Sequence, residues 1–163
     1  RSSSTPQGCW TTTTPASGPK PHPKKDMVAI MAAHGVPYTA SASIAYPKDF
    51  MAKLKKAAAT RGTKFIHLFA SCPTGWRHDT HLSIEVARLA VASRVFPLYE
   101  VIDGENWRMS SMPDKTPVDD YLDMQGRFKA GLAAEGGKAG FQKRVDQQWK
   151  RLKRRCRSDW QGR

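Results

Sequence analysis

The amino-acid sequence predicts an α/β fold with an incomplete, open and mainly parallel sheet, the C-terminal part of a larger domain. Helical and strand-like segments alternate along the chain, as they do in open α/β sheets. Residues 64–70, KFIHLFA, form a continuous apolar run of the kind that is buried on both faces of a parallel sheet. Only one further core strand and one hairpin can be recognised, fewer strands than a stable open sheet normally has. The chain also begins at Arg1 rather than at methionine, so we expect it to be a piece of a longer protein.

The size and composition of the chain fit one globular domain. Its 163 residues, of which 39% are hydrophobic, are enough to bury a core. No run of apolar residues approaches the roughly eighteen that a membrane-spanning helix needs, so we expect no membrane segment. The three cysteines, Cys9, Cys72 and Cys156, are odd in number and far apart, which argues against a disulfide framework and for a reducing compartment.

Capping and helix-breaking residues define the predicted elements before KFIHLFA. Asp26 is placed to cap a helix over residues 27–34, which Gly35 ends. A short strand of β-branched and small residues follows at residues 36–44. Pro47 fits the first turn of the next helix, which leads to the apolar strand. The order helix, strand, helix, strand is that of an open α/β sheet.

The segments after KFIHLFA predict two more helices and a hairpin. A helix is expected over residues 80–93, then a hairpin that turns at Asp103 and Gly104, then a short acidic helix that starts at Pro117. The inward face of the longer helix is predicted to carry Ile84, Ala87, Leu89 or Val91, and Val95. Right-handed crossovers place the carboxyl ends of both parallel strands at one edge, where such folds bind ligands.

Composition divides the chain into three parts. Residues 1–25 are rich in Ser, Thr, Pro and Gly and predict either a disordered leader, which the composition favours, or a long ordered loop held by a partner surface. Residues 26–129 hold the α/β body, and residues 130–163 form a basic helical tail. Much of the net charge of +13 lies in the tail, because residues 138–163 contain ten basic residues and two aspartates. We interpret the tail as a solvated extension, with nucleic acid and an acidic protein as alternative partners.

The stretch FASCPTGW, residues 69–76, carries the candidate functional residue. Cys72 follows the end of a predicted buried strand, on a loop whose backbone is restricted by Pro73 and allowed a close approach to other groups by Gly75. A lone cysteine in this position can be a small buried residue, a nucleophile or a metal ligand. A nucleophile needs a base beside it, and a metal ligand needs partner ligands that this chain does not supply as a recognisable set.

Three histidines lie near Cys72 in the sequence and are the candidate bases. His67 belongs to the strand interior, whereas His78 and His81, in HDTH, are interpreted as surface residues near a helix start rather than as a zinc site. Cys156 is flanked by arginines that could lower its pKa and make it reactive, although we interpret the flanking as incidental. No phosphate-cradling glycine loop and no Ser-His-Asp set is recognisable. The residues alone therefore predict an α/β fragment with one thiol of interest, Cys72.

A family resemblance rests on four segments that occur in order along the chain. They are DMVAIMAAHGVPYTASASIAYPKDFMAKLKKA, FIHLFASCPTGWRHDT, SIEVARLAVASRVFPLYEVIDG and PVDDYLDMQGRF. Together they resemble the C-terminal part of the beta subunit of 2-oxoacid:ferredoxin oxidoreductases, with the pyruvate-type and branched-chain enzymes closest. RSSSTPQG is similar to the segment just downstream of that family's thiamine-binding motif. The resemblance covers about residues 1–129, and the tail from Gly131 onward departs from the family pattern.

The resemblance implies an incomplete thiamine diphosphate-binding fold and a set of cofactors. These are thiamine pyrophosphate, Mg²⁺ and a 4Fe–4S cluster, most of whose ligands lie in the N-terminal half of the family's subunit, outside this chain. Neither a GDG motif nor a pair of closely spaced cysteines occurs here. The fourth cluster cysteine of the family lies in the loop that matches FASCPTGW, so the resemblance makes Cys72 a metal ligand. Residues 1–25 are expected to lie near the cofactor site of the complete enzyme.

The activity that the resemblance implies is CoA-dependent oxidative decarboxylation of a 2-oxoacid, with electron transfer to ferredoxin. The implied partners are the other subunits, ferredoxin, the 2-oxoacid and coenzyme A, in the cytoplasm and without a membrane. The fragment alone is expected to be inactive, because the magnesium and thiamine motif is missing from it. The alternative from another class is a non-enzymatic, basic nucleic-acid-binding module that uses residues 138–163.

Overall fold

Helices and strands alternate in the first half of the chain and give way to a hairpin and two further helices. The computed structural model describes residues 5–7, 9, 20–113, 115–128, 132 and 136–156. In chain order the elements are α1 (Met27–Ala33), β1 (Tyr38–Ser43), α2 (Pro47–Ala59), β2 (Lys64–Phe69), α3 (Pro73–Trp76), the 3₁₀ turn η2 (Thr80–Leu82), α4 (Ser83–Ala92), β3 (Tyr99–Ile102), β4 (Asn106–Met109), α5 (Val118–Asp123), the 3₁₀ turn η3 (Gly126–Phe128) and α6 (Gly137–Arg155).

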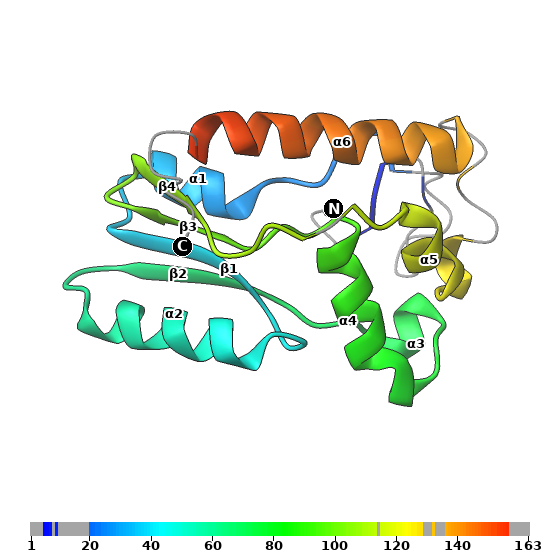
Figure 1. Ribbon diagram of the computed structural model, residues 1–163, viewed down its shortest axis with the longest axis horizontal. Coiled ribbons are helices and arrows are strands. Elements are labelled where there is room, and N and C mark those ends of the chain that lie inside the picture. The colour runs from blue at the N-terminus through cyan, green and yellow to red at the C-terminus, as the bar shows by residue number, and fades with distance from the viewer. Residues whose placement is uncertain are drawn as a thin grey trace.

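The four strands form one open sheet in the order β2-β1-β3-β4. β1 and β2 are parallel, with Ser43 opposite Phe69 at their carboxyl ends, whereas β3 is antiparallel to β1 and β4 is antiparallel to β3. An α/β fold with an open sheet is therefore confirmed, but the expectation of a mainly parallel sheet is wrong. The reason is the position of α4, which lies beyond the carboxyl ends of β1 and β2 (Figure 1). The chain re-enters the sheet from that end, so β3 runs against β1.

Helices cover both faces of the sheet. α2 lies along one face, and α1 and α6 lie along the other (Figure 1). Asp26 caps α1 as predicted, because its Oδ1 accepts a hydrogen bond of 3.1 Å from the Ala29 N–H. Pro47 is the first residue of α2, where its missing N–H costs nothing. These caps place α1 and α2 where the sequence predicts them.

Helix α6 belongs to the core and is not a solvated extension, which corrects the interpretation of the tail. The helix buries one apolar stripe, Phe141, Val145, Trp149 and Leu152, and turns its basic residues outward. Phe141 and Val145 join the apolar cluster around α4 and α5, whereas Trp149 and Leu152 pack with α1 and β3. Because Trp149 is only 5% exposed, much of the folding free energy of the α1–β3 side depends on this helix.

The hairpin between β3 and β4 turns where the sequence predicts it. Asp103 and Gly104 have positive φ values, 52° and 73°, which is the pattern of a two-residue hairpin turn of type I′. A Cβ atom on Gly104 would lie 2.9 Å from the carbonyl oxygen of Ala32, so the glycine also lets the turn approach the end of α1 closely. The turn thus fixes the antiparallel end of the sheet against α1.

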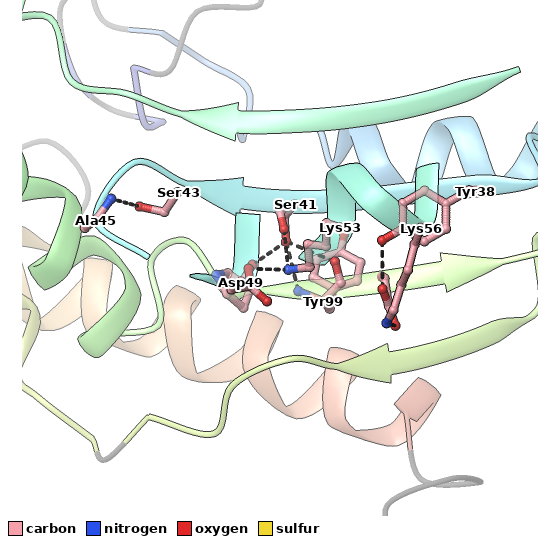
Figure 2. A network of polar contacts seen from close by, with 10 residues as sticks. Tyr38, Ser41, Ser43, Ala45, Asp49, Lys53, Lys56 and Tyr99 are labelled. Carbon is pink, nitrogen blue, oxygen red and sulfur yellow. Dashed lines mark hydrogen bonds and ion pairs between the residues drawn. The ribbon is translucent and has the colours of Figure 1, made fainter. Parts of the chain in front are cut away.

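A buried lysine joins α2 to the central strand (Figure 2). The ammonium of Lys53, which is only 2% exposed, donates hydrogen bonds of 2.7 Å to the carbonyl oxygen of Ser41 and to Oδ2 of Asp49. Burial lowers the pKa of Lys53, and the hydrogen bond and charge of Asp49 oppose that shift. The lysine therefore fixes the distance between α2 and β1.

Glu100 of β3 extends this network to the third strand. Its Oε2 accepts a hydrogen bond of 2.8 Å from the hydroxyl of Tyr38, and its Oε1 pairs with Nζ of Lys56 at 2.6 Å. The side chain of Glu100 is 7% exposed, so the carboxylate needs both partners. Lys56 thereby fixes one flank of α2 toward β3.

Two expectations about buried side chains are wrong. The strand β2 is mostly half-exposed rather than buried on both faces, because in the described part of the chain it lies at an edge of the sheet. Ile84 is 45% exposed, whereas the predicted Ala87 and Val91 are buried, and α4 also buries Val86 and Ala90. None of the helices in the described residues is long and apolar enough to cross a membrane.

Candidate functional site

Cys72 lies at the carboxyl edge of the parallel strand pair, as predicted. It comes three positions after Phe69, the last residue of β2, and it is exposed. Its backbone is extended, with φ −113° and ψ 99°, and it precedes the short helix α3, where Trp76 N–H donates a bond of 2.8 Å to its carbonyl oxygen. The thiol therefore stands on an ordered turn, at the edge where an open α/β sheet binds ligands.

Pro73 and Gly75 shape the turn around the sulfur. Pro73 occupies the first position of α3, where its fixed φ suits the helix. A Cβ atom on Gly75 would lie 3.3 Å from the Cys72 Sγ, so the glycine leaves room beside the thiol. Both residues act as the sequence suggests, one by stiffening the loop and the other by clearing space.

The segment after α5 braces this turn from the other side. The guanidinium carbon of Arg127 lies 3.6 Å from the ring centroid of Trp76, which in turn contacts Phe69 edge to face at 5.6 Å between centroids. Gly126 N–H donates a hydrogen bond of 2.9 Å to the carbonyl oxygen of Arg77. A Cβ atom on Gly126 would lie only 2.9 Å from the Arg77 Cβ, so this close approach needs glycine.

Arg127 is a residue of the candidate site that sequence reasoning missed. Its Nε donates a 2.9 Å hydrogen bond to Gln125 Oε1, and its Nη2 donates one of 3.2 Å to the Tyr121 hydroxyl. Burial lowers the pKa of Arg127, whereas interactions with Tyr121, Cys9 and Cys72 raise it. The guanidinium therefore places a permanent positive charge near the Cys72 thiol. Arg127 belongs to the QGRF motif, but nothing in the sequence connects that motif with a loop about fifty positions earlier.

The histidines do not join Cys72 in a catalytic or metal site. His67 packs its ring against Phe96 at 5.2 Å, and burial, followed by the charge of Lys24, lowers its pKa. His78 Nδ1 lies 2.9 Å from its neighbour's carbonyl oxygen, at Asp79. Within the described ranges, no group of three or more His, Cys, Asp or Glu residues could hold a metal ion. Cys72 can thus supply one ligand of a metal centre but not a complete set.

Two buried polar atoms flank the Cys72 turn without a hydrogen-bond partner among the described residues. They are the hydroxyl oxygen of Ser71 and Nε2 of His78. Buried polar atoms are nearly always satisfied, so we expect partners for these two outside the described residues, with water as the simplest one. Similar atoms occur away from the turn, at Thr39 and Arg94, so they do not by themselves mark a binding site.

The other two cysteines are buried. Cys9 is 1% exposed and belongs to the main apolar cluster. Burial raises the pKa of Cys156 to about 11, and the opposing effect of Arg155 is smaller. The hypothesis of a reactive Cys156 with a lowered pKa is therefore wrong, because the thiol faces the core and not its arginine neighbours.

A basic cleft of about 530 Å³ lies between α1, α6 and the sheet. Its wall includes Lys24, Arg94 and Asp26, but the carboxylate of Asp26 already accepts bonds from the Ala29 N–H and from the Tyr99 hydroxyl. Burial, together with the charges of Arg127 and Lys20, lowers the pKa of Lys24 to about 8. The walls of the cleft therefore carry an excess of positive charge.

Sequence comparison identifies relatives at high identity, although no protein-family model matches the chain. The ketoisovalerate oxidoreductase subunit VorB of Pyrococcus horikoshii is 49% identical over 161 residues, 94% of this chain and 50% of that protein. The pyruvate synthase subunit PorB of Methanosarcina barkeri is 47% identical over 88% of this chain and 49% of its own length. The PorB subunit of Methanocaldococcus jannaschii is 50% identical over 79% of this chain and 44% of its own.

The alignments also correct the expected limit of the family resemblance. A match to 94% of the chain is more than residues 1–129 can account for, so the similarity continues into the tail from Gly131 onward. This agrees with the packing of α6 into the core. The chain spans about half the length of the curated relatives it matches. It is therefore a homologue of the C-terminal part of the PorB and VorB subunits, and belongs with the beta subunits of 2-oxoacid:ferredoxin oxidoreductases.

Proposed function

We propose that this chain is part of a 2-oxoacid:ferredoxin oxidoreductase. The reaction is the CoA-dependent oxidative decarboxylation of a 2-oxoacid, in which the two electrons released pass to ferredoxin and the acyl group passes to coenzyme A. The identity of 47–50% to pyruvate synthase and ketoisovalerate oxidoreductase subunits carries this proposal. Pyruvate and ketoisovalerate, the substrates in the names of these relatives, are both 2-oxoacids, so we propose a substrate of this class whose side chain stays open.

Cys72 is the residue of this chain that we assign to the metal centre. An exposed thiol on a braced turn, beside the charge of Arg127, suits a thiolate that has to bind iron. Cys72 would be one ligand of the metal centre, and the other ligands would come from outside the described residues, which contain no complete set. When bound, a 4Fe–4S cluster supplies one-electron transfer.

The remaining cofactors and partners are proposed for the complete assembly. Thiamine pyrophosphate and Mg²⁺ would be held mainly by residues outside this chain, with residues 1–25 nearby, of which 1–4, 8 and 10–19 lie outside the described residues. The other subunits and ferredoxin would be the protein partners, and the cytoplasm would be the compartment, which suits a chain with few cysteines and no disulfide framework. The chain alone is proposed to be inactive.

The test removes one thiol at a time from the complete subunit. Cys72→Ala should lower the iron content, bleach the visible iron–sulfur absorbance and abolish ferredoxin reduction. Cys156→Ala is the matched control, because this thiol is 5% exposed in a separate cluster, and it should leave the iron content unchanged. An unchanged iron content in the Cys72 variant would show that the ligand assignment is wrong.

The comparisons give no support to the nucleic-acid alternative. The relatives are oxidoreductase subunits, and the apolar stripe of α6 is occupied by packing on the core. The basic face of α6 is left as a charged surface without aromatic stacking positions, which single-stranded nucleic acid would need.

A further inference from the structure

Arg127 carries a half-buried charge that no carboxylate of the described residues balances. Within that part of the chain, its guanidinium donates hydrogen bonds to two neutral groups, the amide oxygen of Gln125 at 2.9 Å and the hydroxyl of Tyr121 at 3.2 Å. None of the ion pairs that the described residues form includes Arg127. A charge held away from water without an opposite charge costs free energy, so we expect the balancing group to lie outside the described residues.

The guanidinium is held against the short helix α3, which begins directly after Cys72. Its central carbon lies 3.6 Å from the ring centroid of Trp76, and the backbone N–H of Trp76 donates a hydrogen bond of 2.8 Å to the carbonyl oxygen of Cys72. The N–H of Gly126 donates a second bond, of 2.9 Å, to the carbonyl oxygen of Arg77. Two links therefore join the Arg127 segment to α3, and moving the charge away from the turn would break them.

A second cation lies at the other end of the same row of aromatic rings. Nζ of Lys24 is 5.0 Å from the ring centroid of Phe96, and that centroid is 4.9 Å from the centroid of Phe69. Phe69 in turn contacts Trp76, over which Arg127 lies. After burial, the charge of Arg127 is the next largest cause of the lowered pKa of Lys24, so the two cations repel each other. The described residues thus leave a net positive charge around these rings.

Of three titratable neighbours of Arg127, only Cys72 is open to solvent. Burial lowers the pKa of Arg127, and the main interactions that oppose this shift come from the Tyr121 hydroxyl and from the thiols of Cys9 and Cys72. Tyr121 and Cys9 are 2% and 1% exposed, inside the main apolar cluster. Cys72 is exposed, and Gly75 leaves space beside its sulfur. An anionic group bound to Cys72 therefore accounts best for the unbalanced charge.

We propose that Arg127 balances the charge of the metal centre at Cys72 and raises its reduction potential. This inference rests on the proposed function, in which Cys72 is one ligand of that centre. A 4Fe–4S cluster held by thiolates is an anion, and an electron taken from the oxidised 2-oxoacid adds one negative charge without making or breaking a ligand bond. A fixed positive charge in a partly desolvated site stabilises the more negative state. Arg127 is thus a positioning residue that acts by its charge as well as by bracing the turn.

The test separates the charge of Arg127 from its bracing by two replacements. Arg127→Lys and Arg127→Gln both lose the planar stacking on Trp76, but only Arg127→Gln loses the charge. The complete subunit is titrated anaerobically with redox mediators, and the reduced metal centre is followed by electron paramagnetic resonance. Arg127→Lys should leave the potential close to that of the unchanged subunit. Arg127→Gln should make reduction less favourable by about tenfold, which is a potential about 59 mV lower for a one-electron couple.

Arg108→Gln is the matched control, because it removes the same formal charge from an exposed position on β4, at the opposite edge of the sheet from β2. It should leave the potential unchanged. Equal potentials of the Arg127→Gln and Arg127→Lys variants would mean that Arg127 acts only by packing, or that a carboxylate from outside the described residues neutralises it, and either result overturns the inference. A decrease as large in the Arg108→Gln variant would also overturn it, since the effect would then follow net charge and not position.

A second pair of measurements compares the two Arg127 variants with and without the metal. With it, the Arg127→Gln subunit should release iron to a chelator about tenfold faster than the Arg127→Lys subunit. In the metal-free chain the unbalanced charge is a cost, so the order reverses and Arg127→Gln should unfold at the higher urea concentration. If Arg127→Lys were the better variant in both measurements, the charge would not be balanced by the metal centre. Absence of iron from the unchanged subunit would overturn the proposed function and this inference together, whereas an unchanged potential overturns this inference alone.

Discussion

The sheet ends in two different edges, and only one of them has the features of a finished protein surface. β4 alternates, with Asn106 and Arg108 exposed and with Trp107 and Met109 packed against the core. β2 carries apolar side chains toward both faces and has Leu68 exposed. Charged, alternating edges resist pairing with other strands, whereas apolar edges promote it. Among the described residues, the β4 side therefore has the features of a complete protein surface, and the β2 side does not.

The largest effect should come from the anchor of α6 on the complete side. Trp149→Ala should lower the free energy of unfolding of the chain by about 4 kcal/mol, because a large buried side chain leaves a cavity between α6 and β3. Urea denaturation followed by circular dichroism measures it. Gln148→Ala, at an exposed neighbouring position, should change it by no more than about 0.5 kcal/mol. Equal effects of the two changes would mean that the complete side does not depend on α6.

The next effect concerns the buried ammonium that holds α2. Lys53→Ala should cost about 3 kcal/mol, since it removes a buried side chain and leaves Asp49 and the Ser41 carbonyl without their partner. Thermal and urea unfolding of the chain alone measure the loss. Lys55→Ala changes an exposed lysine on the same helix and should be nearly neutral. If the Lys53 variant were as stable as the Lys55 variant, the hydrogen bonds of Lys53 would not contribute to the free energy of unfolding.

The third effect compares Arg127, which braces the turn after β2, with Arg108 on the edge strand β4. Arg127→Lys keeps the charge but loses the planar stacking on Trp76 and the bonds to Gln125 and Tyr121, so it should cost about 1–2 kcal/mol. The same change should reduce the iron content of the complete subunit, because the Cys72 turn is less firmly held. Arg108→Lys on β4 is the control and should alter neither quantity. Identical iron contents in the two variants would argue against bracing by Arg127.

The smallest effect is a pH dependence at the basic cleft. The folded state holds the pKa of Lys24 at about 8, below the ordinary 10.5, so the unfolded chain binds more protons between these values. Stability contributed by this group therefore rises as pH increases from about 8 to about 10.5. At each pH, the unfolding free energy of the Lys24→Met variant is subtracted from that of the unchanged chain. The subtraction removes the contribution of the tyrosines and cysteines, which titrate in both proteins. A difference that stays flat over this range would contradict the burial of Lys24.

Local signals in the sequence predicted most element boundaries. Asp26, Pro47 and the Asp103–Gly104 turn act through their own backbone chemistry, so their neighbours in sequence suffice to interpret them. The direction of β3 was not predictable in this way, because it depends on where α4 places the chain after leaving β2. Strand pairing is a long-range property, and a local apolar run is compatible with either direction.

The candidate site was predictable in its central residue but not in its surroundings. The apolar run that ends before Cys72 locates the thiol at the sheet edge, and the structure places it there. Arg127 was missed because a contact with Trp76 crosses fifty positions of sequence. In the tail, apolar residues recur at helical spacing, which predicts a helix that packs on the core: Phe141, Val145, Trp149 and Leu152. This pattern was overlooked because the tail carries so many charges. Net charge predicts solvent exposure poorly when a helix is amphipathic.

Cys72 follows the edge strand β2 by only three positions and is exposed, which has a consequence for how the protein matures. A molecule without metal would expose this thiol to dioxygen at the place where we propose that iron is bound. Maturation would then depend on how soon iron reaches the thiol, and oxidative damage would fall first on molecules that have not yet received it.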